Sequence, residues 1–367
     1  MHNLLETRSL EEYIVKYGLS RGLFPEKSAV AKVKVFWFLY RQALSCSNHP
    51  ERYYWKARIP KKTDVKRNIF IPKYAIKDHQ ITILKMLNEM PVSEYSYSYC
   101  KGRNIKQVAQ IHYDAHKKIL LKLDIEDFFG SIHYLDVYKV FRSETGASKA
   151  LCTFCSNICC LYDSVPQGAS TSPVLSNIVF RPLDEEIRQY AEEQGVVYTR
   201  YSDDLIFSFD DDVNPKDVIR FVRKLLRRHG FKLNEQKTKV TKPGGRYDVF
   251  GIVIGEKIQV GAKYRRSLRQ AFYYITKFGL EEHMKRNPEL SFDEMNEEDR
   301  LKSRLKYLQK LRGKIQYVLH INPSDNAMRK HLDEVDSMIS EHNEEIERLK
   351  PMIIRAFEAI PDDDIPW

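Results

Sequence analysis

The chain has 367 residues, of which 43% are hydrophobic and 30% charged, so it is long enough to bury a core and to form two or three structural units. No apolar run reaches the roughly 18 residues that a membrane span needs. The N-terminus also lacks the basic-then-apolar order of a signal peptide. We therefore expect a globular, cytoplasmic protein with no membrane partner.

The net charge of +10 is unevenly distributed. Residues 51–80 hold nine Lys or Arg against three Asp or Glu, whereas residues 321–367 hold five against twelve. A basic body of this kind is typical of proteins that bind a polyanion such as nucleic acid.

The first half of the chain predicts helices around a basic hairpin and a buried strand. Residues 1–50 have helical spacing and predict two or three helices. Residues 51–73 contain two β-rich segments joined by a polar turn at Thr63 and Asp64. Residues 74–118 are expected to be mostly helical, and ILLKLDIEDFF is a buried strand that ends in acids. A helical stretch over 134–160 and the loop VPQGASTSPVLSNIVF follow, and this loop runs into a helix that continues through Tyr190.

The second half predicts short strands and then helices. VVYTRY and LIFSF are strands on either side of an Asp pair, and a helix is expected from about Pro215 to His229. Three short strand segments come next, GFKLNEQKTKV, RYDVFGIVIG and KIQVG. From Tyr264 onward the pattern is almost entirely helical, apart from the acidic gap NPELSFDEMNEED.

Four cysteines cluster in LCTFCSNICC. Cys152, Cys155 and Cys159 recur at helical intervals beside apolar residues, which favours a buried helix face in a reducing compartment over a zinc site. We expect neither zinc nor a disulfide.

The carboxylates Asp203 and Asp204 interrupt an apolar run, and Asp124 ends another strand. An isolated Asp pair is typical of a solvated hairpin turn. Here the long apolar flanks and the acid-tipped strand upstream favour a cluster of three carboxylates, which would be costly without cations. Mg²⁺ prefers hard oxygen ligands and substrate phosphates, so the pattern indicates two-metal phosphoryl transfer, with the ions about 4 Å apart.

Five segments in order, LDIEDFF, PQGASTSPVLSN, YSDD, GFKLNEQKT and VFGIVIG, resemble the successive palm motifs of reverse transcriptases, and KRNIFIP resembles their fingers motif. The resemblance covers residues 50–320. Within the family the chain is most similar to bacterial retron reverse transcriptases, because of ICC before the PQG loop, VAQIH at 108–112 and LRGKIQYV near the end. Val108 and the VFG at 249–251 depart from the retron pattern.

The resemblance implies an α+β right-hand polymerase fold with fingers, a palm with an antiparallel sheet and a helical thumb. We expect these regions at the following residues: an N-terminal helical extension at 1–50, fingers at 51–120, a palm at 121–260 with part of the fingers at 134–165, a thumb at 261–320 and an acidic C-terminal helix at 321–367.

The resemblance also implies the catalytic residues. Asp124, Asp203 and Asp204 would bind two Mg²⁺ ions, and the Ile125 carbonyl would be a further ligand.

The resemblance implies nucleotide contacts as well. Arg67 would hold the triphosphate, together with one lysine among Lys61, Lys62 and Lys66, any of which could instead be a solvated charge. Phe129 would crowd a ribose 2′-OH, or would be a core residue. Gln167 and Gly168 would lie against the nucleotide and template, or form a helix-entry turn. Lys237 would lie near the leaving pyrophosphate.

Primer and template contacts are implied further along the chain. Phe250 and Gly251 would hold the primer end, or form a buried β-turn. After them, apolar residues from Leu301 to Val318 recur every three or four positions, and between them lie cations that would face the duplex backbone: Lys306, Lys310, Arg312 and Lys314. The acidic helix would pack on its own thumb or dock a partner.

The function implied by the resemblance is RNA-directed DNA synthesis from deoxynucleoside triphosphates on a dedicated structured non-coding RNA. A branched RNA–DNA product and a role in antiphage defence with an effector protein follow from the resemblance alone. The alternatives are another bacterial reverse transcriptase, of the abortive-infection or group II intron type, and a non-catalytic RNA-binding protein on a polymerase scaffold.

Overall fold

The computed structural model describes residues 8–20, 41, 45, 49–60, 66–243, 245–286 and 297–358. The chain divides into two compact units, residues 1–245 and 246–367. No helix in these described ranges is long and apolar enough to cross a membrane.

The elements of the first unit are α1 Leu10–Ser20, β1 Tyr54–Pro60, β2 Lys66–Pro72, α3 Tyr74–Leu87, α4 Ile105–Asp114, β3 Ile119–Glu126, α5 Tyr134–Thr145, α6 Lys149–Cys159, α7 Ser172–Glu193, β4 Val197–Tyr201, β5 Asp204–Phe209, α8 Pro215–Arg228, β6 Lys232–Leu233 and β7 Lys239–Thr241.

The central sheet of the first unit has the order β4-β5-β3-β6, and β7 also pairs with β3. All of its pairings are antiparallel. Strand β3 carries the expected buried run, in which Leu121 and Leu123 are fully buried opposite Phe207 and Leu205 of β5. The mixture of this antiparallel sheet with separate helices confirms the α+β class.

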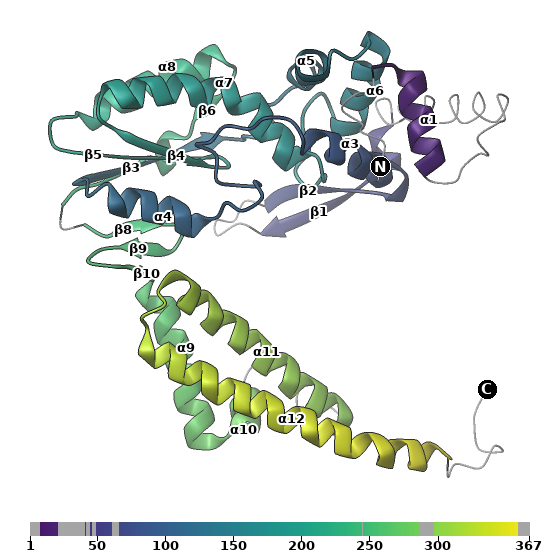
Figure 1. Ribbon diagram of the computed structural model, residues 1–367, viewed down its shortest axis with the longest axis vertical. Helices are drawn as coiled ribbons and strands as arrows, with labels where there is room; N and C mark the ends of the chain where they lie inside the picture. Colours follow the sequence, from purple (N-terminus) through teal and green to yellow (C-terminus); the bar gives the residue numbers. More distant parts are fainter. Residues whose placement is uncertain are drawn as a thin grey trace. The chain divides into compact units, whose positions relative to one another are not determined.

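Helices cover both faces of this sheet (Figure 1): α7 and α8 lie on one side and α4 on the other. On the α4 side, the buried ring of His112 contacts the hydroxyls of Ser208 and Thr199 at 2.7 and 2.9 Å. Burial lowers the pKa of His112 to about 3, so the ring is neutral. The histidine of VAQIH therefore links its helix to both strands of the β4–β5 hairpin.

The basic hairpin formed by β1 and β2 is confirmed, with pairing from Tyr54↔Pro72 to Pro60↔Lys66. The Phe70 amide of β2 donates to the Gln167 carbonyl at 2.7 Å. Gly168 has a φ of +115°, and a Cβ there would lie 2.7 Å from the Phe70 oxygen. Glycine at 168 therefore lets the backbone of β2 approach the loop before α7 closely. The expected turn at Thr63 and Asp64 lies outside the described residues.

The segment between α3 and α4 differs from the mostly helical pattern expected for 74–118. Helix α3 ends at Leu87, and the chain then runs irregularly past Pro91 to the capping residue Asn104. Part of this segment lies along β4, because the Tyr97 amide donates to the Arg200 carbonyl and the Arg200 amide to the Tyr95 carbonyl. Proline disfavours a continuous helix, and pairing with β4 supplies the hydrogen bonds that a helix would have made.

Cys152, Cys155 and Cys159 lie on α6 and are buried in the core, as the helical spacing of LCTFCSNICC predicts. Burial raises the pKa of the Cys155 thiol well above its usual value.

The second unit contains a separate three-stranded antiparallel sheet, of order β10-β9-β8, and four helices in its described part. Its elements are β8 Tyr247–Val249, β9 Ile252–Ile254, β10 Ile258–Val260, α9 Ala262–Phe278, α10 Leu280–Lys285, α11 Glu297–Ile321 and α12 Asn326–Glu358. The RYDVFGIVIG segment was expected within a palm ending at 260, but it lies beyond the division at residue 245. The names fingers, palm and thumb remain predictions for these regions.

Helices α11 and α12 pack against each other. The apolar stripe of α11 is buried, including Leu308, Ile315 and Val318, as its spacing predicts. Helix α12 contributes the buried residues Met328 and Val335. The first half of the acidic helix thus packs within its own unit, which is the first of the two alternatives that its pattern allowed.

Candidate active site

The Asp pair lies where β4 turns into β5. Tyr201 pairs with Asp204, so Ser202 and Asp203 form the two-residue link between the strands. Ser202 has a φ of +59°, in the left-handed region that non-glycine residues seldom adopt. The Asp203 carbonyl accepts a hydrogen bond from the Ile125 amide at 2.9 Å. This bond ties the turn to the end of β3, next to Asp124.

Asp124 and Asp204 are cross-strand partners in the β3–β5 pairing, so their side chains leave the same face of the sheet. Asp124 is 5% exposed. Its Oδ2 lies 2.8 Å from Lys237 Nζ, and Asp204 Oδ1 lies 3.1 Å from Lys122 Nζ. Sequence reasoning missed Lys122, although the alternation of β3 places it two residues before Asp124 and therefore on the same face.

Burial, the neighbouring carboxylates and the two lysines shift pKa values at this site. Burial raises the pKa of Asp204 to about 6; the ammonium of Lys122 opposes this shift, while Asp203 and Asp124 add to it. The hydrogen bond to Asp124 raises the pKa of Lys237. The negative charge at the ends of β3 and β5 is therefore only partly compensated by the two lysines.

A cleft of about 600 Å³ opens beside Asp124 and Asp203. Several residues predicted from the sequence line it together: Arg67, Asp124, Ile125, Phe129, Gln167, Asp203 and Lys237. Tyr99, Ser202 and Asn234 also line it and were not predicted. Asn234 belongs to the NEQKT motif, and its amide donates to the Asp124 carbonyl at 2.8 Å. Its place in that motif was the one signal that could have found it.

The two adjacent phenylalanines of LDIEDFF have different surroundings. Phe128 is 3% exposed, and its ring packs against those of Phe180 and Phe231. Both residues border the cleft, but Phe129 is only partly buried. Phe128 is therefore the core residue of the two, and the position of Phe129 is compatible with a contact to a bound nucleotide.

Gln167 also lines the cleft. Its side-chain Oε1 is buried and has no hydrogen-bond partner. Buried amide oxygens normally have a partner, so this atom marks a place where a ligand hydrogen bond would stabilise the site.

A divalent cation can be tested against the donor atoms present. Within residues 8–20, 49–60, 66–243, 245–286 and 297–358, no three His, Cys, Asp or Glu side chains lie close enough together, as they stand, to hold a metal ion. The expected convergence of three carboxylates is not seen in this arrangement, in which Lys237 binds Asp124 and Lys122 binds Asp204.

The chemistry of the donors nevertheless fits a hard cation. Asp124 Oδ1 is buried without a hydrogen-bond partner, and Asp204 leaves the same face of the sheet from the neighbouring strand. A buried, unsatisfied carboxylate oxygen is costly unless a cation or a donor completes it. Asp124, Asp203 and Asp204 are therefore the residues that would hold the metal.

Other predicted residues are not placed at this cleft. Lys61 and Lys62 lie outside the described residues, and Lys66 is described only as part of β2.

Phe250 and Gly251, with φ of +55° and +84°, form the tight turn between β8 and β9 in the second unit. On α11, Lys306, Lys310 and Lys314 are exposed, whereas Arg312 forms an ion pair with Asp336 of α12 at 2.5 Å.

Comparison with known proteins gives matches of three kinds. The family model described as reverse transcriptase (RNA-dependent DNA polymerase) matches residues 59–264. The retron Ec86 reverse transcriptase of Escherichia coli is 31% identical over 57% of this chain and 65% of its own length. The retron Mx65 reverse transcriptase of Myxococcus xanthus is 29% identical over 73% of this chain and 66% of its own. The aligned regions thus span slightly less than two thirds of these relatives.

Among solved structures, the apo telomerase of Candida tropicalis is similar with a TM-score of 0.49 and 10% sequence identity. The match covers 83% of this chain and 64% of that one. The resemblance to retron reverse transcriptases that the motifs indicated is confirmed by the family model and the two retron relatives.

Proposed function

The chain belongs to the reverse transcriptase (RNA-dependent DNA polymerase) family, and from that premise we propose that it is an RNA-directed DNA polymerase of the retron type. One observation carries most of the proposal. Asp124 and Asp204 are adjacent on one face of the sheet, Asp203 lies in the next turn, and Asp124 and Asp203 open onto a cleft lined by other family-motif residues. A protein that only bound RNA would not need partly compensated, buried carboxylates at that place.

We expect the residues of the cleft to have different roles in nucleotide addition. When bound by Asp124, Asp203 and Asp204, divalent cations, which we take to be two Mg²⁺ ions, would activate the primer hydroxyl and stabilise the leaving pyrophosphate. Arg67 would bind the triphosphate through its fork of N–H donors. Lys237, which now neutralises Asp124, would move its charge toward the pyrophosphate when a cation takes its place.

Phe129 and Gln167 would act on the two sides of the incoming nucleotide. The Phe129 ring lines the cleft and would leave no room for a ribose 2′-OH, so deoxynucleotides are preferred. The buried Oε1 of Gln167 would gain a donor from the nucleotide or template.

The proposed template and product rest on similarity to the retron relatives alone. We propose that the template is a dedicated structured non-coding RNA, that the product is single-stranded DNA joined to this RNA, and that an effector protein acts with the enzyme in antiphage defence. Phe250, Gly251 and the exposed lysines Lys306, Lys310 and Lys314 would contact the primer–template duplex.

An extension assay tests the polymerase assignment. Wild-type protein should extend a DNA primer on an RNA template with deoxynucleotides and Mg²⁺, and Asp203→Asn should abolish extension while RNA affinity stays close to wild type. Asp211→Asn is the matched control, because Asp211 follows the opposite end of β5, is exposed and pairs with Lys118. Normal extension by Asp203→Asn would refute the catalytic assignment.

A second experiment tests the retron assignment. The protein should co-purify with one abundant RNA, and sequencing of that nucleic acid should reveal a branched RNA–DNA species. A heterogeneous RNA population with no joined DNA would point to another class of bacterial reverse transcriptase.

A further inference from the structure

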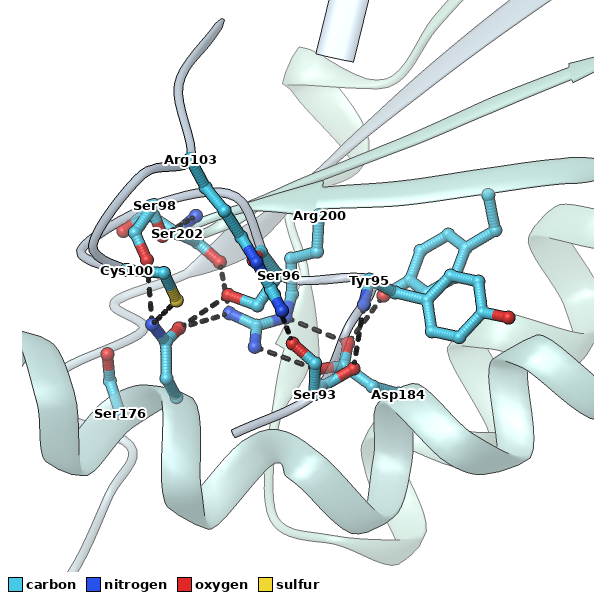
Figure 2. A network of polar contacts seen from close by, with 12 residues as sticks. Ser93, Tyr95, Ser96, Ser98, Cys100, Arg103, Ser176, Asp184, Arg200 and Ser202 are labelled. Carbon is cyan, nitrogen blue, oxygen red and sulfur yellow. Dashed lines mark hydrogen bonds and ion pairs between the residues drawn. The ribbon is translucent and has the colours of Figure 1, made fainter. Parts of the chain in front are cut away.

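The turn that carries Asp203 rests on a buried polar cluster that the catalytic proposal does not use. At its centre is Arg200, the residue two before Ser202, whose side chain is fully buried. Figure 2 shows its guanidinium directed toward Asp184 of α7, with Ser96, Ser98 and Cys100 along the adjacent loop. The cluster therefore joins the catalytic hairpin, α7 and the irregular segment before α4.

Arg200 is held on every side. Its Nε and Nη2 donate to the two carboxylate oxygens of Asp184, each at 2.8 Å, and its Nη1 donates to Asn177 Oδ1 at 3.0 Å. Its guanidinium also lies over the Phe180 ring, 4.7 Å from the centroid. A bidentate, stacked arginine of this kind has a single orientation that a lysine cannot reproduce.

Asn177, the last residue of the PQGASTSPVLSN motif, extends the cluster to the loop. Its Nδ2 donates to the Ser98 carbonyl at 2.7 Å, and its Oδ1 accepts from the Ser96 hydroxyl at 2.9 Å. Asn177, Ser96 and Ser98 are all buried. The bond from Asn177 Nδ2 fixes the loop backbone at Ser98 relative to α7. Asn177 Oδ1 keeps a second donor, Arg200 Nη1, when the Ser96 hydroxyl is absent.

The Ser202 peptide units are held from two directions by this cluster. The Ser202 amide donates to the Ser98 hydroxyl oxygen at 2.7 Å, and the Ser202 carbonyl accepts from Arg200 Nη1 at 3.2 Å. Ser202 has a positive φ, which persists in a non-glycine residue only where the surrounding structure imposes it. Asp203 and Asp204 follow directly in the chain. The orientation of the Ser202 peptide therefore sets the backbone position from which their carboxylates extend.

We propose that Ser98 is a positioning residue for the catalytic turn. Its hydroxyl oxygen, anchored through Asn177 and the Arg200–Asp184 pair, holds the Ser202 amide in the orientation that lets Asp203 and Asp204 bind divalent cations together with Asp124. The inference rests on the proposed polymerase function and adds to it a residue outside the cleft.

Two serine variants test the inference. Ser98→Ala removes the acceptor of the Ser202 amide, whereas Ser96→Ala removes a hydroxyl from the same loop that bonds only to Asn177 among the contacts described. Both side chains are fully buried and each variant loses one buried hydrogen bond. Both melting temperatures should therefore fall, by about 2 to 8 °C. The fall should be larger for Ser98→Ala, because the Ser202 amide loses its acceptor while Asn177 Oδ1 keeps Arg200 Nη1 as a donor.

The two variants should differ in metal binding and in catalysis. Mn²⁺ binding to the nucleic-acid-free protein, followed by electron paramagnetic resonance, should be weakened by Ser98→Ala and unchanged by Ser96→Ala. In primer extension, Ser98→Ala should lower kcat by about tenfold or more with an unchanged nucleotide KM, because the geometry of the reacting groups is altered while the nucleotide contacts remain. Ser96→Ala should keep the wild-type kcat.

The outcomes separate this inference from the proposed function. If Ser98→Ala matched Ser96→Ala in both Mn²⁺ binding and kcat, Ser98 would be a structural residue only and the inference would be overturned. If wild-type protein failed to extend any primer, the polymerase proposal would fail, while the Mn²⁺ comparison of the two variants would still decide whether Ser98 positions the carboxylates.

Discussion

Two acid–base pairs lie next to the β4–β5 hairpin, Asp184–Arg200 and Asp124–Lys237, and they differ in how completely their charges are compensated. Asp184 and Arg200 are both fully buried, and both carboxylate oxygens accept from the guanidinium. Asp124 is almost as buried, but its partner Lys237 is 57% exposed at the side chain and only one carboxylate oxygen is bonded. A fully satisfied buried pair holds structure in place, whereas a half-satisfied one can exchange its partner for a ligand.

The same contrast recurs between neighbouring residues elsewhere. Both Phe128 and Phe129 border the cleft, but Phe128 is buried in the core while Phe129 is only partly buried. Arg312 is paired with Asp336 while Lys310 is exposed. Phe128 and Phe129 are neighbours of the same type, and Lys310 and Arg312 are nearby cations. Substituting both members of each of these two sets therefore separates structural from functional roles.

The largest loss of stability is expected at the Asp184–Arg200 pair. Asp184→Asn leaves the Arg200 charge buried without a counter-ion, and such a change costs about 3 to 5 kcal/mol of folding free energy. Urea denaturation at pH 7 measures it. Glu185→Gln is the control, because Glu185 pairs with Arg188 on the exposed side of α7. A small loss at Asp184 would mean that the pair is not the structural anchor we describe.

At Asp204, next to Asp124, we expect removal of the charge to raise the stability of the protein instead of lowering it. The pKa of Asp204 is raised from 3.8 to about 6, so the metal-free folded protein keeps a proton there that the unfolded chain has lost. This group therefore lowers stability as pH rises from about 4 to 6, and the penalty is complete above pH 6. Asp204→Asn should raise stability at pH 7 by up to about 3 kcal/mol.

Melting curves in a chelator, recorded from pH 4 to pH 8, measure this gain. The difference between Asp204→Asn and wild type should vanish near pH 4 and reach its full value above pH 6. Added Mg²⁺ should stabilise wild type more than the variant, because the variant has lost a ligand. A difference that does not depend on pH would contradict the assignment of the shift to Asp204.

The two phenylalanines should separate discrimination from stability. Phe129→Val should raise ribonucleotide incorporation relative to deoxynucleotide, by an amount equivalent to about 1 to 3 kcal/mol, because steric exclusion of the 2′-OH is lost. Single-nucleotide extension with each substrate measures the ratio. Phe128→Val should instead lower the melting temperature and change the ratio less, because the Phe128 ring is buried against Phe180 and Phe231. A larger change of the ratio for Phe128→Val than for Phe129→Val would reverse the two roles.

The smallest effect is expected on α11. Lys310→Ala should flatten the slope of log K against log salt for binding of a structured RNA by about 0.7 to 0.9 if Lys310 neutralises one phosphate. Arg312→Ala should change the slope less, because its guanidinium is already paired with Asp336. Filter binding across a salt series distinguishes the two, and equal slope changes would show that Asp336 does not withdraw Arg312 from the RNA.

The sequence alone determined the parts of this protein that depend on local order. The alternating and apolar strands around Asp124 and Asp203, the basic hairpin, the helical spacing of α11 and the ordered family motifs are all properties of short segments. They sufficed to predict the family and, through that resemblance, to name candidate catalytic residues.

Tertiary structure alone decided which charges are compensated and what holds the turn. Lys122 and Lys237 meet the carboxylates only through strand pairing, and Ser98 meets Ser202 across 104 positions of sequence. The irregular path of residues 88–104 was unpredictable for the same reason, because the hydrogen bonds that place Tyr95 and Tyr97 are made with Arg200 of β4, about 100 positions away. Contacts between segments so distant in the chain leave no periodicity, since each partner satisfies its local pattern whether or not the other is present.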